Sequence, residues 1–414
     1  MQPHSAPFVI IGAGPSGLMA AETIAAQGYA VQLFDRMPSP ARKFLLAGRG
    51  GLNLTHSEPL EHFLPRYGTA QPWLEPSVRA FSPEMLRAWC EGLGQETFVG
   101  SSGRVFPKAM KAAPLLRVWL QRLQALGVQY YPRHRWIGWY DDQLLFEDGA
   151  QQQVAVRPPA ALLALGGASW PRLGSDGNWV SLLAARGVPI TPLAPANAGF
   201  KVAWSAYFRE RFAGQPLKPL AMTHGVTTQQ GEAMITEDGI EGGLVYALGA
   251  RLRDTINHAG KAAVTLDLRP TMTQASLAQK FALPRRTKSF SSYLRSAGFS
   301  PLAVALLHEA FPKDALQDAY GDALAAMLKA VPLTLRAPTG MARAISTAGG
   351  IAQQAVDERF MLRSMPGLFV AGEMLDWEAP TGGYLLQGCF STAVAAARGM
   401  VQYATAATEV PHAL

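Results

Sequence analysis

The sequence has few cysteines, no metal-binding motif and no long apolar run. Its 414 residues include two cysteines, Cys90 and Cys389, and no CxxC pair, which excludes a disulfide framework and gives no reason to expect a metal. No stretch of about 18 uninterrupted apolar residues occurs, so no membrane-spanning helix is expected. The first residues lack a basic n-region, and their apolar run leads directly into glycines, as in a first strand. These absences favour a cytoplasmic protein that needs neither metal nor membrane.

Acidic residues are also missing from one long stretch, residues 97–140. The net charge of the chain is +7, and this stretch holds seven basic residues and no Asp or Glu. A charge run is usually a solvated surface, and the alternative is a site for a polyanion, from a nucleotide cofactor to RNA. RNA therefore stays a candidate partner. The basic residues are Arg104, Lys108, Lys111, Arg117, Arg122, Arg133 and Arg135.

The segment "FVIIGAGPSGLMAAETIAAQGYAVQLFDR" has the pattern of a dinucleotide-binding unit. It predicts a strand, a tight turn, a helix and a second strand. Gly12 would permit the turn, Gly14 would let the backbone approach a pyrophosphate, and Gly17 would let the helix press against the sheet. The helix begins at Pro15 and Ser16, and its unpaired N–H groups suit phosphate.

The second strand and the loop after it add polar groups to this unit. The strand ends in Asp35, where a carboxylate can accept hydrogen bonds from ribose hydroxyls. A basic, glycine-containing loop follows, which could wrap the pyrophosphate and the ribityl chain of a cofactor longer than NAD. Surface solubility is the alternative explanation for its arginines. The cofactor-binding residues expected here are Arg36, Arg42, Lys43, Gly50, Gly51 and Asn53.

Two later strands also run into glycine. "ALLALGGASW" breaks at Leu165, Gly166 and Gly167, and ligands bind where strands end in a doubly wound sheet. "FVAGEMLDWEAPTGGYLLQG" repeats the strand–glycine–helix pattern near the carboxyl terminus, as a long cofactor such as FAD would require. Glu373 would accept from ribityl hydroxyls, and the following helix would direct its positive end at the flavin ring. The residues expected to contact FAD here are Gly372, Glu373, Gly382, Gly383, Tyr384, Leu386 and Gln387.

Residues 193–335 have a different character, with proline-rich, strand-like segments followed by helical ones. The sheet-type pattern resumes after them. We therefore expect a first part of the FAD-binding domain at 1–192, an insert domain at 193–335, and the second part of the FAD-binding domain at 336–414.

The chain resembles the BaiN/RdsA-type NAD(P)/FAD-dependent oxidoreductases, which are also known as aminoacetone-oxidase-like flavoproteins. The similarity covers nearly the whole chain and is carried by "IIGAGPSGLMAA", "LLAGRGGLNLTH", "GRVFPKAMKA", "LALGGASWPRLGSDG", "STAGGI" and "GLFVAGEMLDWEAPTGGYLLQG". It implies an α/β fold: a glutathione-reductase-like Rossmann FAD-binding domain interrupted by an insert of a small β barrel plus helices. The family usually reads "SGGGRCNLTN" and "TGGYNLQ" where this chain has "AGRGGLNLTH" and "TGGYLLQ", which indicates a divergent subgroup.

The chemistry expected of such a chain belongs to the flavin. No Ser/His/Asp order or P-loop stands out, and no catalytic residue is assigned. We expect an FAD-dependent oxidoreductase that transfers hydride through flavin N5, with NAD(P)H as a transiently bound donor and an unidentified small molecule as acceptor. The resemblance also permits an RNA-modifying flavoenzyme like a ribosomal RNA dihydrouridine synthase. A non-catalytic flavin-binding module is the third alternative.

Overall fold

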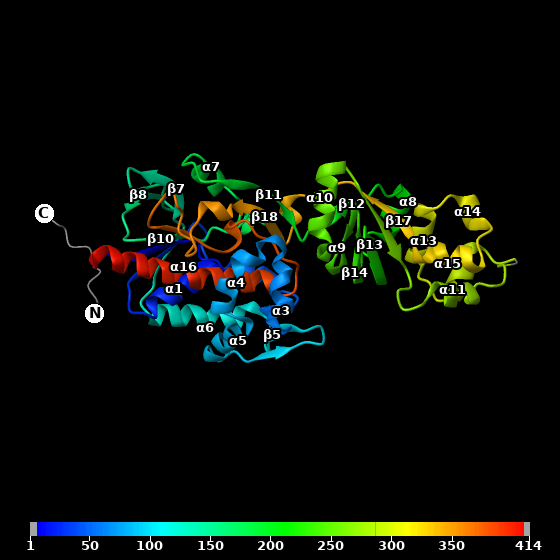
Figure 1. Ribbon diagram of the computed structural model, residues 1–414, viewed down its shortest axis with the longest axis horizontal. Coiled ribbons are helices and arrows are strands. Elements are labelled where there is room, and N and C mark those ends of the chain that lie inside the picture. Colours follow the sequence, from blue (N-terminus) through cyan, green and yellow to red (C-terminus); the bar gives the residue numbers. More distant parts are fainter. Residues whose placement is uncertain (1–5, 286, 410–414) are drawn as a thin grey trace. The chain divides into compact units, whose positions relative to one another are not determined.

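The computed structural model describes residues 6–285 and 287–409. Internal contacts divide the chain into two compact units: unit 1 combines Met1–Ala194 with Ser346–Leu414, and unit 2 is Pro195–Ile345. Unit 1 is thus built from both ends of the chain. In Figure 1 its blue helix α1 (Pro15–Ala25) lies beside its red helix α16 (Tyr384–Glu409). The domain boundaries expected at 192/193 and 335/336 remain a proposal, while the compact units change at 194/195 and 345/346.

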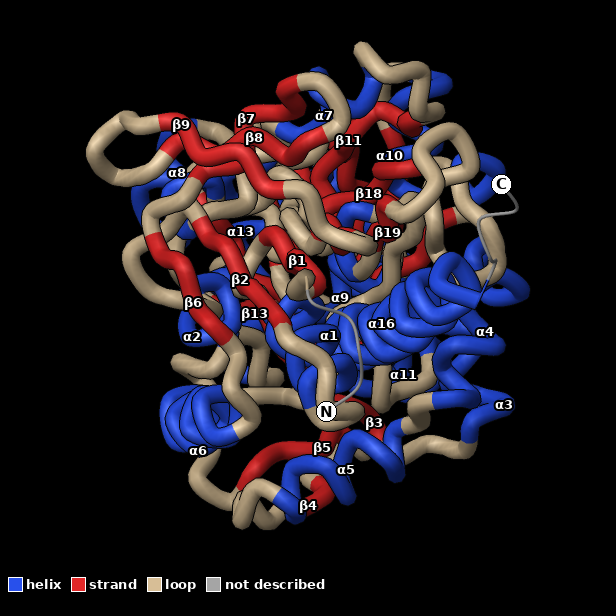
Figure 2. Tube along the Cα trace, turned by 90° about the vertical axis from the view of Figure 1, so that its left-hand side faces the viewer, coloured by secondary structure: helices blue, strands red, loops and turns tan. Residues whose placement is uncertain are grey.

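The centre of unit 1 is a five-stranded parallel sheet with the order β19-β10-β1-β2-β6. Its inner strands β1 and β10 are continuous apolar runs whose residues are almost fully buried, as expected of a parallel sheet covered on both faces. Figure 2 shows β6, β2 and β1 side by side. The strands are β1 (Phe8–Ile11), β2 (Val31–Asp35), β6 (Gln129–Pro132), β10 (Ala161–Leu163) and β19 (Leu368–Val370). This sheet confirms the predicted Rossmann-type α/β class.

Helices α1 and α16 pack against each other on this sheet. Small side chains such as Ala393, Ala396 and Ala397 of α16 are fully buried, which allows the close approach of the helices. Glu22 of α1 accepts hydrogen bonds from Trp89 and Arg122, so one buried carboxylate joins three helices. The other helices of unit 1 are α2 (Arg42–Ala47), α3 (Leu60–Phe63), α4 (Gln71–Ala80), α5 (Pro83–Gly92), α6 (Ala112–Ala125) and α7 (Trp179–Ala184).

Three small sheets complete unit 1. A two-stranded sheet pairs β11 (Ile190–Ala196) with β18 (Ser346–Ile351). Two further sheets, β3-β5-β4 and β7-β8-β9, have three antiparallel strands each. Their strands are β3 (Thr55–His56), β4 (Thr97–Val99), β5 (Arg104–Pro107), β7 (Arg135–Tyr140), β8 (Gln143–Glu147) and β9 (Gln153–Val156). Of these, β3 and β7 carry residues that matter for the site.

Unit 2 contains a six-stranded antiparallel sheet and a set of helices around a core of its own. The sheet order is β12-β15-β14-β13-β16-β17, and Lys201 joins its two edges through hydrogen bonds with Arg336 (2.9 Å) and Ala337 (2.7 Å). These bonds bring the residues that follow β17 next to β12 at the opposite edge of the sheet, an arrangement consistent with the small β barrel that the family resemblance implies. Its strands are β12 (Phe200–Lys201), β13 (Pro216–His224), β14 (Thr227–Thr236), β15 (Gly239–Glu241), β16 (Ala262–Asp267) and β17 (Val331–Leu335). Its helices are α8 (Ala206–Phe212), α9 (Gly243–Ala247), α10 (Gly249–Ala259), α11 (Gln274–Lys280), α12 (Phe290–Ser296), α13 (Pro301–Ala310), α14 (Lys313–Gln317) and α15 (Gly321–Lys329).

Candidate functional site

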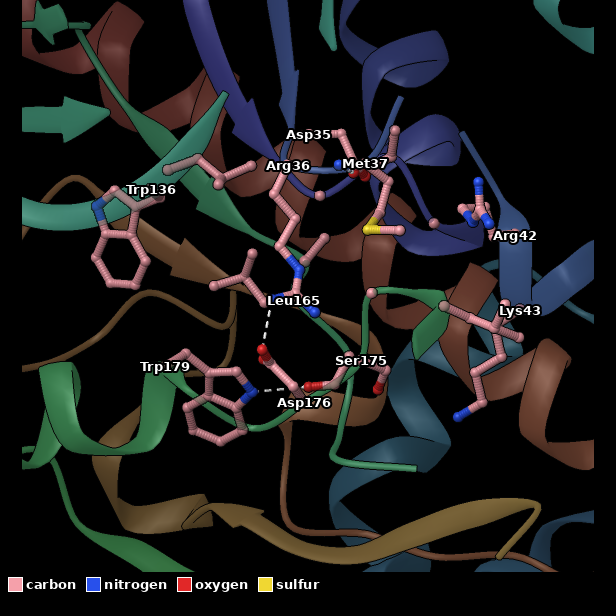
Figure 3. Close-up of a pocket in the computed structure, with 18 of the residues that line it drawn as sticks. Asp35, Arg36, Met37, Arg42, Lys43, Trp136, Leu165, Ser175, Asp176 and Trp179 are labelled. Atoms are coloured by element: carbon pink, nitrogen blue, oxygen red, sulfur yellow. Dashed lines mark hydrogen bonds and ion pairs between the residues drawn. The ribbon is translucent and has the colours of Figure 1, made fainter. Parts of the chain in front are cut away.

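A cavity of about 420 Å³ lies in unit 1, where β1, β2 and β10 end. Ligands of open parallel sheets bind at this edge, beyond the carboxyl ends of the strands. Figure 3 shows side chains from β2, the loop after it and the loop after β10 surrounding this space. The sequence-predicted residues that line it are Gly12, Gly14, Pro15, Ser16, Asp35, Arg36, Arg42, Lys43, Leu165, Gly166 and Glu373. The structure therefore brings the amino-terminal and carboxyl-terminal motifs to one cavity.

The three glycines of the first turn differ in what a side chain would meet. A Cβ on Gly12 would lie 2.3 Å from the carbonyl oxygen of Ala164, and one on Gly17 would lie 1.8 Å from the carbonyl oxygen of Gly12. Both glycines are thus required by the packing of the chain itself. A Cβ on Gly14 would have no described atom within 4 Å. Because Gly14 faces open space at the start of α1, it leaves room for a ligand beside the helix N–H groups.

Asp35 is held by the backbone around it. One carboxylate oxygen accepts from the Ala13 N–H and the other from the Met37 N–H, each at 2.6 Å. Burial raises the pKa of Asp35, although these hydrogen bonds and the nearby arginines oppose the rise. The carboxylate thus fixes the turn to the end of β2. The predicted hydrogen bond from a ribose hydroxyl would be an additional one on an oxygen already in use.

Four polar atoms at the cavity have no hydrogen-bond partner among the described residues, although they are buried. They are Arg36 Nε, Arg42 Nε, Ser175 Oγ and Trp136 Nε1. Buried polar atoms are rarely left unpaired, and such a group calls for a ligand or water. Guanidinium N–H groups and a hydroxyl suit phosphate and ribose oxygens. The residues present therefore fit an anionic nucleotide.

Glu373 and Lys43 both line the cavity and form an ion pair with each other. Lys43 Nζ lies 2.8 and 3.0 Å from the two carboxylate oxygens of Glu373 and 2.6 Å from Ser169 Oγ. Glu373 also accepts from the Thr347 N–H at 3.0 Å and the Gly167 N–H at 3.4 Å. Its carboxylate thereby joins segments from both ends of the chain. The hydrogen bonds to ribityl hydroxyls predicted for it would add to this set.

The remaining predicted residues lie outside the lining of the cavity. Gly372 adjoins it, since a Cβ there would lie 2.2 Å from Ser16 Oγ. A Cβ on Gly383 would lie 2.4 Å from the backbone of Thr55, so this glycine serves the contact between α16 and β3. Gln387 is fully buried and bonds to Thr55 Oγ1 and the Phe81 carbonyl. The predicted residues that do not line the cavity are Gly17, Gly50, Gly51, Asn53, Gly167, Gly372, Gly382, Gly383, Tyr384, Leu386 and Gln387.

The model of the HI0933-like protein Rossmann domain matches residues 6–399. The chain belongs to this family. It is similar to the 3-dehydro-bile acid delta(4,6)-reductase of Clostridium scindens, with 26% identity over 408 residues that cover 95% of this chain and 98% of the relative. The resemblance to the BaiN/RdsA-type oxidoreductases is thereby confirmed.

Two solved structures share the fold of this HI0933-like chain. A 3-ketosteroid delta1-dehydrogenase from Sterolibacterium denitrificans matches with a TM-score of 0.53 and 12% identity, over 97% of this chain and 99% of that one. A flavocytochrome c3 fumarate reductase matches with a TM-score of 0.51 and 15% identity, over 96% and 78% of the two chains. Family and fold together support an oxidoreductase of the flavoprotein class with a Rossmann-type nucleotide-binding domain.

Several residues that line the cavity of the HI0933-like chain were missed from the sequence. Those from β7 and the turn before it carry no motif and could not have been found. Ser175 and Asp176 stand in "LALGGASWPRLGSDG", a segment that supports the family resemblance. That segment was the available signal. The missed residues include Met37, His134, Trp136, Ile137, Ser175, Asp176 and Trp179.

Ion pairs with acidic residues compensate part of the positive charge of the stretch 97–140. Acidic residues from outside the stretch pair with three of its seven cations, in the ion pairs Lys108–Glu96, Arg122–Glu22 and Arg135–Glu147. The relatives reported above give no support for an RNA partner of this chain. In the described residues, no helix is long and apolar enough to cross a membrane, and no cluster of metal-binding side chains occurs.

Proposed function

We propose that this chain is an FAD-dependent reductase that acts on a carbon–carbon double bond conjugated to a carbonyl group in a small molecule. The full-length family relative is named for reducing such a system in a bile acid, which supports this substrate class. The cofactor assignment rests on the cavity, where Gly14 leaves open space and where buried polar atoms have no hydrogen-bond partner among the described residues.

Different residues of the cavity would bind different parts of FAD. The N-terminal turn of α1 and the guanidinium groups of Arg36 and Arg42 would bind the pyrophosphate. Glu373 and Lys43, which also line the cavity, would contact the ribityl chain. Bound FAD supplies hydride transfer at its N5 atom. The protein's own contribution is to bind, orient and charge-compensate the cofactor.

We propose NAD(P)H as the electron donor. The sequence has one GxGxxG motif, and the FAD cavity uses it. A second nucleotide would then lack a Rossmann unit of its own and would bind only transiently, next to the flavin. This arrangement predicts a high dissociation constant for the donor and ping-pong kinetics for the enzyme.

The decisive experiment starts with the flavin. Purified protein should absorb near 450 nm, and heat denaturation should release FAD, identified by mass spectrometry. Anaerobic addition of NADH or NADPH should bleach the flavin, and an α,β-unsaturated ketone should restore the colour with formation of the saturated product. Loss of both steps in the Gly14→Glu protein serves as the control.

Each step of this experiment can refute a part of the proposal. A colourless protein that does not take up FAD refutes the cofactor assignment. Flavin that neither nicotinamide bleaches, but dithionite does, refutes NAD(P)H as donor. Reduced flavin that no conjugated ketone reoxidises refutes the substrate class, and flavin that never turns over with any acceptor favours a non-catalytic flavin-binding module.

A further inference from the structure

The loop between β10 and α7 runs along one side of the cavity and is fixed near both of its ends. At its start, the N–H groups of Ala168 and Ser169 donate to Thr347 Oγ1 at 2.9 and 3.2 Å. At its end, the indole N–H of Trp179 donates to the carbonyl of Gly166 at 2.9 Å. The residues between these anchors, 170–178, are termed the strap.

The middle of the strap contacts the end of β2. Arg36 forms an ion pair with Asp176, and it donates to the carbonyl of Pro171 at 3.4 Å. The Met37 side chain lies 2.9 Å from the position that a Cβ on Gly174 would take. Figure 3 shows Arg36 extending from β2 to Asp176, with the dashed line marking their contact. One ion pair therefore connects the two sides of the cavity.

Two properties of the strap suit it for opening. Gly174 and Gly177 both have positive φ, +109° and +72°, where glycine has access to more backbone conformations than other residues. The side chains of Arg36 and Asp176 are 28% and 22% exposed, so water can replace their contact. Partly exposed ion pairs are weak, and salt screens them.

The pair also leaves polar atoms directed at the cavity. Arg36 Nε and, next to Asp176, Ser175 Oγ are buried and have no hydrogen-bond partner in the part of the chain that the structure describes. Both residues line the cavity. A guanidinium N–H suits a phosphate oxygen, and a hydroxyl can donate to or accept from phosphate or ribose.

We propose that the strap closes over a bound dinucleotide, with the Arg36–Asp176 pair holding it shut while Arg36 Nε and Ser175 Oγ bind the ligand beneath. This inference rests on the proposed function, since it takes FAD as the occupant. Asp176 is thereby a positioning residue, because it acts through Arg36. FAD must pass the strap both on entry and on release, so breaking the pair accelerates both steps. A residue that only contacted FAD would change the dissociation rate alone.

The test measures FAD association and dissociation with apoprotein by stopped-flow fluorescence. Asp176→Asn keeps the shape of the side chain and removes the ion pair. We expect both rate constants to rise about two- to fivefold, the size of a weak ion pair, while the dissociation constant changes less than twofold. Raising the salt concentration should accelerate FAD release from the wild type more than from Asp176→Asn, because salt screens the contacts to the pyrophosphate in both proteins and the strap pair only in the wild type.

The matched control is Asp142→Asn, which removes a second Arg–Asp pair of unit 1. Its partner Arg157 lies 3.2 Å away, and the side chains of Arg157 and Asp142 are 63% and 85% exposed. This variant should leave both rates unchanged. Arg36→Gln breaks the strap pair from the other side, and in that background Asp176→Asn should have no further effect on association.

The outcomes separate the two proposals. A wild-type apoprotein that binds no FAD overturns the proposed function and the strap together. Normal binding by the wild type with no rate change in Asp176→Asn overturns the strap alone. A rise in dissociation without a rise in association also overturns it, because Asp176 would then be a simple ligand contact.

Discussion

The two glycine turns of unit 1 precede the two helices that pack together, yet they have different surroundings. The turn before α1 faces the cavity, and a Cβ on Gly14 would meet no described atom within 4 Å. The turn before α16 is covered by protein, and a Cβ on Gly383 would lie 2.4 Å from the Thr55 backbone. One motif therefore leaves space for a ligand, and the other brings two parts of the chain together.

This difference shows that a glycine after a strand has two physical explanations. It can allow a ligand to approach the backbone, or it can allow another backbone to do so. The first explanation predicts a loss of binding on substitution, with the fold intact. The second predicts a loss of stability. The substitutions below separate them, beginning with the largest expected effect.

Gly383→Ala should destabilise unit 1 by about 3–5 kcal/mol, because a methyl group would overlap the Thr55 backbone at a residue with φ of +99°. Chemical denaturation followed by circular dichroism measures this effect. Gly243→Ala, at a helix position with open space around it, is the control in unit 2. A Gly383→Ala protein as stable as the wild type would show that α16 can move away from β3.

Gly14→Glu should abolish FAD retention and leave the fold intact. The site has room for a side chain, and φ there is −81°, so the backbone is unstrained. The new carboxylate would repel the pyrophosphate at the start of α1, although a negative charge there suits the helix itself. FAD content and thermal unfolding are measured on the same sample. Gly14→Ala, which adds no charge, should keep much more FAD, and yellow Gly14→Glu protein would contradict the assignment.

Glu373→Ala tests the ion pair of Glu373 with Lys43 at the cavity. It should weaken FAD binding by about 1–3 kcal/mol, the size of a charge-assisted hydrogen bond. Because Lys43 and the Thr347 N–H also lose their acceptor, stability should fall with it. Titration calorimetry of apoprotein with FAD measures the first effect. Glu373→Gln keeps an acceptor and should lie between the alanine variant and the wild type, and an unchanged dissociation constant would remove Glu373 from the site.

The sequence predicts the structure correctly where a motif and the residues it contacts lie close together in the chain. The strand–turn–helix unit around Gly12 and Gly17, and the Rossmann class that it implies, follow from local geometry. The partners of Gly383 and Gln387 are contributed by Thr55 and Phe81, more than 300 residues away, and no local pattern encodes that contact. For the same reason no local pattern assigns a role to Asp176, because its partner Arg36 follows β2, 140 residues earlier in the chain.

The smallest expected effect concerns Tyr384, the first residue of α16. Its hydroxyl donates to Glu58 at 2.6 Å, and Arg66 donates to both oxygens of the same carboxylate at 3.2 and 2.9 Å. Burial alone would raise the pKa of Glu58, but the hydrogen bonds from Arg66 and Tyr384 outweigh it and hold that pKa below its usual range. Tyr384→Phe, which removes one of these bonds, should cost about 1–2 kcal/mol of stability.

The lowered pKa fixes the pH dependence of this contact. A carboxylate with a lower pKa in the folded state stabilises the protein fully above its unfolded value, about 4.5, and loses that contribution as the pH falls through the folded value. The stability difference between wild type and Glu58→Gln should therefore be constant near neutral pH and shrink below about pH 4.5. Denaturation curves at pH 7, 5 and 3.5 test this. A difference that persists unchanged at the lowest pH would contradict the contribution assigned to the charge of Glu58.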